Sequence, residues 1–192
     1  MQSRDAFAVR CGARQRERQL GTGYGYGIFV DGHFAGEINV SSVQRGPFQS
    51  AYVGYWIDEA RAGNSNVAEA LVVVIRHCFE DLRLHRHQIA IIPRNRASRR
   101  VVEKLDIREE GTALRYLEIN GVWEDHVRYA ITAEDWDVRH DVVLHVDDEH
   151  GGVGTIRQAA HEVLLPVPTD VQSTHSLRSS SWRTSQSSAV MA

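Results

Sequence analysis

Apolar and polar positions form their clearest pattern between residues 51 and 82. A largely apolar run at 51–57 predicts a strand, and the polar residues Gly63, Asn64, Ser65 and Asn66 predict a loop after it. Apolar residues then recur at helical spacing: Val67, Ala70, Leu71, Val74, Ile75, Cys78 and Leu82. The first amides of such a helix lack internal partners and can receive an anion. A plain polar turn before a buried helix is the alternative interpretation.

Turn signals and periodicity predict the remaining elements. Strands at 24–30 and 33–41 flank Asp31-Gly32, and strands at 116–119 and 122–131 flank Asn120-Gly121, so each pair predicts a tight hairpin. The other expected elements are an exposed helix at 3–20, a loop at 42–49, a third strand at 50–57, a strand at 87–92, and a helix at 96–105 that Asn95 caps and that turns Ala97, Val101, Val102 and Leu105 inward.

The order of these elements indicates the fold class. A strand, a crossover helix and a second strand form a parallel unit, which binds its ligand beyond the carboxyl ends of the strands. The hairpins add antiparallel strands around this unit. We therefore expect an α/β (more strictly α+β) domain with a mixed central sheet and two crossover helices.

Composition limits the classes of partner. The 192 residues carry a formal net charge of -3, which gives no global attraction to nucleic acid or to anionic lipid. Two cysteines, Cys11 and Cys78, are too few for a disulfide framework. No apolar run approaches the roughly 18 residues of a membrane span, and the first 20 residues lack the apolar centre of a signal peptide. The expected location is cytoplasmic, without a membrane partner.

A change of composition after residue 136 predicts a boundary. Residues 1–136 hold all the periodic elements, whereas 137–192 lose periodicity and end in a serine-rich run, so we expect a mostly disordered tail. His140, His145 and His150 lie in that tail among acidic residues. Their five-residue spacing places no pair on one helical face, so we expect no metal site.

Four blocks of sequence then stand in order: GYWIDE at 54–59, LHR at 84–86, PRNRASRRVVEKL at 93–105 and RYLEINGVWEDH at 115–126. Together they resemble the GNAT superfamily of acetyltransferases, and within it the RimJ/RimL type, which acetylates the N-terminal amine of ribosomal and other proteins. The resemblance runs from about residue 24 to 136. It implies the mixed central sheet of the GNAT type in a domain at 1–136, with the family's N-terminal strand and helix apparently absent.

The resemblance also implies roles for individual residues. Main-chain amides of the loop at 62–68 would hold the phosphates of acetyl-CoA, and the loop residues concerned are Gly63, Asn64, Ser65, Asn66, Val67 and Ala68. The main chain of Trp56 and Ile57 would bind the pantetheine arm and polarise the thioester carbonyl. Asn95 would contact the pantetheine. Ser98 would return a proton to the leaving thiolate, or would merely complete the helix start.

Some positions differ from the family pattern. Ala62, Ser65 and Val67 stand where the loop usually has Gln or Arg, then Gly, then Gly or Ala, and Asp106 replaces a Gly after the second helix. A side chain where the backbone needs positive φ costs about 1 kcal/mol or more. Glu37 and Asp125 are weak candidates for the general base, and a chain of water molecules is an equal alternative.

The expected function is transfer of an acetyl group from acetyl-CoA to a primary amine, foremost the N-terminal amine of a protein. The acceptor would be a protein N-terminus, ribosomal proteins included, or a small amine. The expectation involves no metal and no direct nucleic-acid contact, and it leaves a homodimer open. The alternative is a non-catalytic GNAT-like interaction module with weak or no CoA binding.

Overall fold

The computed structural model describes residues 4–137 and 164–166. Its elements, in chain order, are α1 (Arg4–Leu20), β1 (Tyr24–Val30), β2 (His33–Gln44), β3 (Ser50–Ile57), the 3-10 helix η1 (Glu59–Arg61), α2 (Asn66–Glu80), β4 (Arg86–Ile91), α3 (Arg96–Lys104), β5 (Arg108–Ile119), β6 (Val122–Thr132) and β7 (Leu164–Pro166). Among the described residues, no helix combines the length and the apolarity that a membrane span requires.

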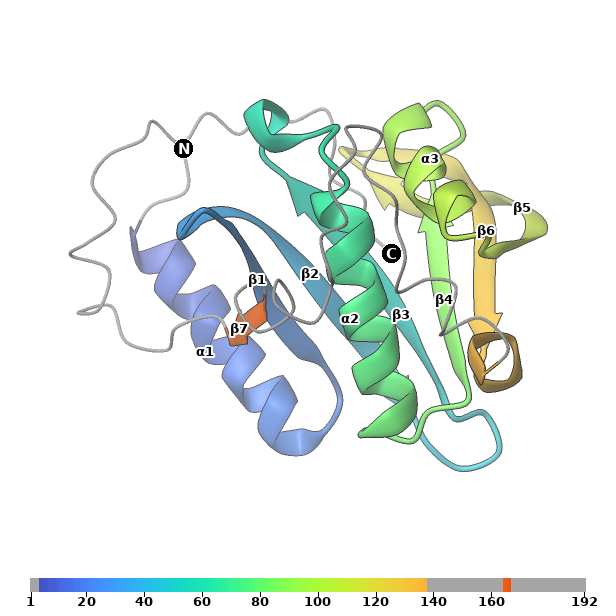
Figure 1. The fold of residues 1–192 in the computed structure, drawn as a ribbon, viewed down its shortest axis with the longest axis horizontal. Helices are drawn as coiled ribbons and strands as arrows, with labels where there is room; N and C mark the ends of the chain where they lie inside the picture. Colours follow the sequence, from blue (N-terminus) through green and yellow to red (C-terminus); the bar gives the residue numbers. More distant parts are fainter. Residues whose placement is uncertain (1–3, 138–163, 167–192) are drawn as a thin grey trace.

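The strands form one mixed sheet in the order β5-β6-β4-β3-β2-β1-β7 (Figure 1). Only β3 and β4 pair in parallel, and α2 is the crossover between them. Helices α2 and α3 cover the same face, because His87 contacts Phe79 of α2 while Tyr55, on the same side of the sheet, contacts Ser98 of α3. The mixed sheet with a parallel central pair confirms the expected fold class.

Both predicted hairpins are present, and their turns have left-handed backbones. Asp31 and Gly32 have φ values of 52° and 72°, and Asn120 and Gly121 have φ values of 53° and 81°. Two successive residues with positive φ make the turn that fits the twist of a two-residue hairpin. Glycine and short polar side chains tolerate this region best, which explains why these dipeptides were informative in the sequence.

Three boundaries or faces differ from the sequence-based expectation. Strand β2 continues to Gln44 through a register shift at Ser41, so part of the expected loop at 42–49 is strand. Strand β5 begins at Arg108 rather than at 116. Ala97 is exposed, whereas Val102 and Leu105 are buried and Val101 packs against the core as expected, and Ser98 is buried beside them. Ser98, Val102 and Leu105 are spaced i, i+4 and i+7, which places them on one face that packs against the sheet.

The expected tail lies almost entirely outside the described residues. The exceptions are Asp137 and β7, whose three residues pair antiparallel with β1, with Gly27 opposite Leu165. Such a pairing uses backbone groups, so it needs no periodic apolar face. The predicted disorder of the rest of 137–192, together with His140, His145 and His150, falls outside the part of the chain that the structure describes.

Two histidines are fully buried among the described residues, His87 and His126. His87 on β4 is fully buried against Phe79, and neither ring nitrogen has a hydrogen-bond partner among the described residues. Burial lowers the pKa of His87 from 6.5 to about 3, because the charged imidazolium is poorly solvated there. The folded chain therefore holds this ring neutral, while the unfolded chain binds a proton near pH 6.5.

We expect His87 to make the fold acid-sensitive. Its contribution to stability is complete above pH 6.5 and is lost as the pH falls toward 3, since protons then favour the unfolded chain. At pH 5 the loss amounts to about 2 kcal/mol. Chemical denaturation of the wild type and of His87→Leu between pH 7.5 and 5 tests this. The variant should lose distinctly less stability on acidification, and parallel curves for the two proteins would refute the prediction.

Candidate active site

The parallel strands β3 and β4 separate after three residue pairs. Their pairing comprises Ser50 with Arg86, Ala51 with His87, and Tyr52 with Gln88. Beyond this point, 53–57 of β3 pair only with β2, and 89–91 of β4 pair only with β6. Each carboxyl half therefore has one edge whose backbone groups have no strand partner within 4–137 and 164–166. We call the opening between these two edges the slot; it lies at the strand ends where a parallel unit binds its ligand.

Helix α3 is tied to the slot by a buried hydrogen bond. The Tyr55 hydroxyl on β3 donates to the carbonyl oxygen of Ser98 at 3.1 Å. Burial raises the pKa of Tyr55, so its hydroxyl remains a protonated donor. This contact places the first turn of α3 beside the carboxyl half of β3.

Asn95 and Ser98 lie at this first turn, and their side chains have different hydrogen-bonding roles. The Asn95 Oδ1 accepts from the Ser98 backbone N–H at 3.1 Å, which confirms the predicted cap. This hydrogen bond involves the backbone N–H of Ser98 and not its hydroxyl. The side chain of Ser98 is 8% exposed, and its Oγ has no hydrogen-bond partner among the described residues. The helix start and a chemical role for the hydroxyl are therefore compatible.

The loop before α2 presents open amides. Ser65 is the N-cap of α2, with φ 59° and no side-chain cap bond, and its carbonyl accepts the first helical bond from the Glu69 amide at 3.0 Å. The amides of Asn66, Val67 and Ala68 consequently have no acceptor within the described part of the chain. Gly63 and Asn64 are exposed in front of them. Amides grouped in this way at a helix start suit an anion.

Ser65 shows how the loop differs from the family pattern. A residue with a Cβ pays about 1 kcal/mol for the left-handed conformation that glycine adopts freely. Because this backbone turns the hydroxyl away from the helix, Ser65 Oγ is bonded instead by the Lys104 ammonium at 2.8 Å. Lys104 is the last residue of α3 and was not singled out in the sequence, since only the fold brings it to the loop.

The main chain at Trp56 and Ile57 is held against β2. Gly36 pairs with Ile57, and a Cβ added at Gly36 would lie 2.2 Å from the Trp56 carbonyl oxygen. No side chain other than that of glycine fits there without moving Trp56. The signal was present in the sequence only as an isolated glycine within a strand, which indicates close backbone approach.

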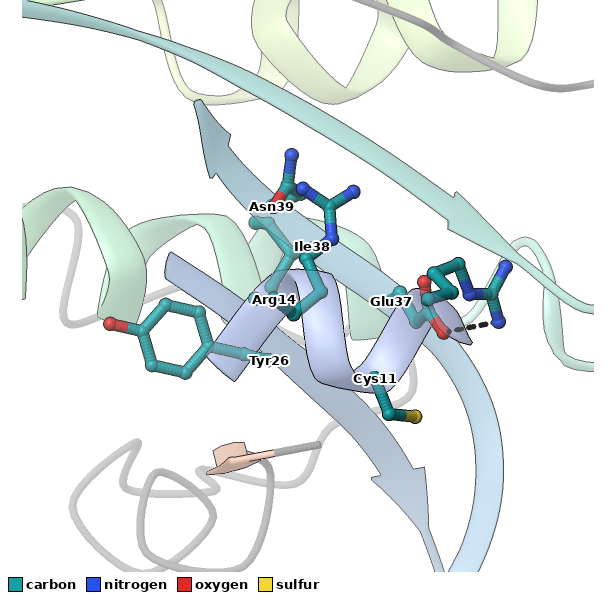
Figure 2. A pocket seen from close by; sticks show the side chains of 8 residues that line it. Cys11, Arg14, Tyr26, Glu37, Ile38 and Asn39 are labelled. Atoms are coloured by element: carbon teal, nitrogen blue, oxygen red, sulfur yellow. Dashed lines mark hydrogen bonds and ion pairs between the residues drawn. The ribbon is translucent and has the colours of Figure 1, made fainter. Parts of the chain in front are cut away.

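The two candidate bases have different surroundings. Glu37 lies opposite Trp56 across β2 and β3, and its carboxylate accepts from Arg10 at 3.0 Å and from the Trp56 indole at 3.4 Å. It also lines a small cavity between α1, β1 and β2, which Figure 2 shows with the Arg10–Glu37 ion pair. Asp125 instead accepts from the Arg115 backbone at 2.7 Å, at an irregularity in the β5–β6 pairing.

The cysteines and the acidic side chains limit the kinds of reaction that the site can catalyse. Cys11 and Cys78 are both buried, and burial raises the pKa of each thiol, that of Cys78 to about 12, which disfavours the nucleophilic thiolate. Within 4–137 and 164–166, no group of three or more His, Cys, Asp or Glu side chains is arranged to hold a metal ion. The site therefore offers open main-chain donors, a free hydroxyl and a carboxylate.

The chain is similar in sequence to a known family and to several known proteins. The sequence family described as "Acetyltransferase (GNAT) domain" matches residues 2–108. The probable N-acetyltransferase YjcK of Bacillus subtilis is 40% identical over 114 residues, which are 58% of this chain and 63% of that protein. The [ribosomal protein uS5]-alanine N-acetyltransferase of Escherichia coli is 33% identical over 132 residues, or 68% of each chain.

Solved structures agree with these matches. Mycobacterium smegmatis RimJ in complex with CoA-disulfide superposes with a TM-score of 0.66 at 36% identity, covering 68% of this chain and 63% of that one. The ribosomal-protein-S5-alanine acetyltransferase of Vibrio fischeri superposes with a TM-score of 0.64 at 30% identity, covering 71% and 78%. This chain thus spans 63% of the length of both the B. subtilis relative and the M. smegmatis structure.

The mixed sheet, the slot between β3 and β4 and the loop that opens α2 confirm the resemblance seen in the sequence blocks. On the sequence match and on the solved relatives together, this chain belongs to the GNAT acetyltransferase family, and its relatives include RimJ-type acetyltransferases of ribosomal proteins.

Proposed function

We propose that this chain transfers the acetyl group of acetyl-CoA to the N-terminal amine of a protein, with ribosomal proteins as the acceptor class. The main support for this proposal is the slot between β3 and β4. Its unpartnered backbone edges are accompanied by the open amides of α2 and by the Ser98 hydroxyl. Support for the acceptor comes from the E. coli relative, which is named for acetylating alanine of ribosomal protein uS5. An enzyme with this acceptor works in the cytoplasm.

The described residues fit acetyl-CoA along one continuous path. The amides at 66–68 suit the pyrophosphate, the main chain of Ile57 on the free edge of β3 suits the amide groups of the pantetheine arm, and Asn95 retains its Nδ2 as a further donor. The Trp56 main chain faces β2 opposite Glu37 and supports this edge from the other side. The relative solved with CoA-disulfide supports this use of the fold.

The reaction is a direct transfer with balanced proton movements. The neutral amine of the acceptor attacks the thioester carbonyl, a C–N bond forms, and the C–S bond breaks. We assign Glu37 to accept the proton of the ammonium, directly or through one water, because it lies opposite Trp56 near the carboxyl end of β3, whereas Asp125 lies on β6. Glu37 also accepts hydrogen bonds from Arg10 and from the Trp56 indole. Main-chain N–H groups near Trp56 and Ile57 stabilise the oxyanion. Ser98 Oγ then protonates the leaving thiolate, and water restores its proton.

Acetyl-CoA binding and acetyl transfer test the proposed function together. Ligand at a hundred times its Kd should stabilise the fold by about 2.7 kcal/mol through mass action. We expect a thermal shift with acetyl-CoA, and acetylation of a peptide that carries an N-terminal alanine, detected by mass spectrometry. A Tm that does not change at millimolar acetyl-CoA would overturn the enzyme function and would favour the non-catalytic module. That alternative arises because Ala62, Ser65 and Val67 differ from the family pattern.

Ser98→Ala and Glu37→Gln should separate proton transfer from binding. Each variant is expected to lower kcat by about a hundredfold or more, because proton transfer typically contributes that much, while the affinity for acetyl-CoA stays close to wild type. Asp125→Asn is the matched control, since an amide oxygen can still accept from the Arg115 N–H. Unchanged turnover in Ser98→Ala would reduce Ser98 to a helix-start residue.

Gly36→Ala should damage the slot through the backbone. Its methyl group would be forced against the Trp56 carbonyl, so we expect both a lower Tm and a loss of acetyl-CoA affinity of about tenfold, equivalent to about 1.4 kcal/mol. Gly12→Ala provides the control, because no atom lies within 4 Å of a Cβ added there and alanine favours a helix. The role given to the Trp56 main chain fails if Gly36→Ala binds acetyl-CoA as tightly as Gly12→Ala does.

A further inference from the structure

The far end of α3 brings a positive charge to the loop that opens α2. The Lys104 ammonium bonds the neutral hydroxyl of Ser65 at 2.8 Å, and no carboxylate lies within ion-pair distance of it among the described residues. Its charge is therefore held in place without being neutralised by an acidic side chain. A lysine in the last turn of a helix also complements the helix dipole, but that role alone requires no bond to another element.

Lys104 is the end of a basic stripe along α3. Arg96, Arg100 and Lys104 are spaced i, i+4 and i+8, so they share one face, and all three side chains are exposed. The side chains of Arg96 and Arg100 have no hydrogen bond or ion pair with another residue of the described ranges, although their backbones are bonded. Arg99, one position away from Arg100, differs in this respect.

Arg99 faces other elements and is engaged by them. It donates to the Tyr129 hydroxyl at 3.0 Å and lies 3.7 Å from carboxylate oxygens of Glu103 and Glu109. Arg99 thus has acidic partners, whereas the side chains of Arg96, Arg100 and Lys104 form no ion pair among the described residues. Although the exposed Glu103 lies nearby on the same helix, these three cations lead toward Ser65 and can attract a phosphate dianion.

The position of the stripe distinguishes among the phosphates of the coenzyme. Lys104 is six positions after Ser98, so it lies about 9 Å farther along the helix than the residue beside the slot. The amides at 66–68 already supply neutral donors for the pyrophosphate. The ammonium bonds Ser65, the residue just before these amides, so it is placed to meet a further phosphate of a coenzyme whose pyrophosphate is held there.

We propose that Lys104, supported by Arg100 one turn before it, binds the 3′-phosphate of acetyl-CoA and thereby makes the chain selective for the coenzyme over its 3′-dephospho form. This inference rests on the proposed function and adds to it a residue pair that decides which nucleotide is accepted. The contact replaces the neutral partner Ser65 with a charged one, so the ammonium gains a stronger hydrogen bond when the coenzyme binds.

The test compares two ligands in calorimetry: acetyl-CoA and acetyl-3′-dephospho-CoA. The wild type should bind acetyl-CoA about tenfold more tightly, equivalent to about 1.4 kcal/mol. Lys104→Met should lose most of that preference by weakening acetyl-CoA only, and Lys104→Arg should retain it. Arg83→Met is the control, because it removes one positive charge at the other end of α2, which is about 21 Å away by helix length.

The outcomes separate the inference from the function on which it rests. Equal weakening of both ligands in Lys104→Met would assign the lysine to the pyrophosphate and overturn the proposal, as would a wild type without preference. Loss of preference in Arg83→Met as well would show a general charge effect and would also overturn it. A wild type that binds neither ligand would instead overturn the proposed function itself. The proposal is supported if Lys104→Met abolishes the preference for acetyl-CoA over acetyl-3′-dephospho-CoA and Lys104→Arg keeps it.

Discussion

The early end of the β3–β4 pairing is the constraint on which the rest of the site depends. Three paired positions hold the two strands together, and beyond Tyr52 and Gln88 each strand turns to its other neighbour. Backbone N–H and C=O groups need partners, so two unpaired strand edges inside a sheet are costly unless something fills the gap. An elongated ligand with its own amide groups, such as a pantetheine arm, is suited to that position because it can replace the missing strand.

The elements around the slot secure this opening. The bond from the Tyr55 hydroxyl to the Ser98 carbonyl spans from β3 to α3, and the Asn95 cap fixes the turn in which Ser98 lies. On the other side, Gly36 lets the Trp56 main chain approach β2 closely. A preorganised main chain of this kind stabilises a developing oxyanion without rearranging during the reaction. The splayed strands, rather than any single catalytic side chain, therefore explain why the fold suits acyl transfer.

The loop before α2 leaves its amides open although its sequence differs from the family pattern. Ser65 adopts the left-handed conformation although it has a Cβ, and the strain of about 1 kcal/mol is borne by the surrounding structure. The same conformation turns the hydroxyl outward, so it leaves the first amides of α2 unblocked and meets Lys104. A serine in the usual capping geometry would have satisfied one of those amides itself. Serine in place of the glycine that the family usually has thus adds backbone strain at position 65 and provides a hydrogen bond to Lys104 of α3.

The sequence by itself determined the features that depend on neighbouring residues. Helical spacing predicted α2, Asp31-Gly32 and Asn120-Gly121 predicted the two hairpins, and Asn95 predicted the start of α3, since periodicity, turn chemistry and capping act over a few positions. The family resemblance added the likeness to acetyltransferases.

Only the tertiary structure decided the features that join distant residues. Among these are the point where β3 and β4 part, the contact of Lys104 with Ser65 across 39 positions, and the pairing of β7 with β1. The outward position of Ala97 belongs with them, because its apolar side chain predicted an inward position and packing against the sheet instead turned Ser98 inward. Such contacts arise from the balance of burial and backbone pairing over the whole sheet, which local patterns do not record.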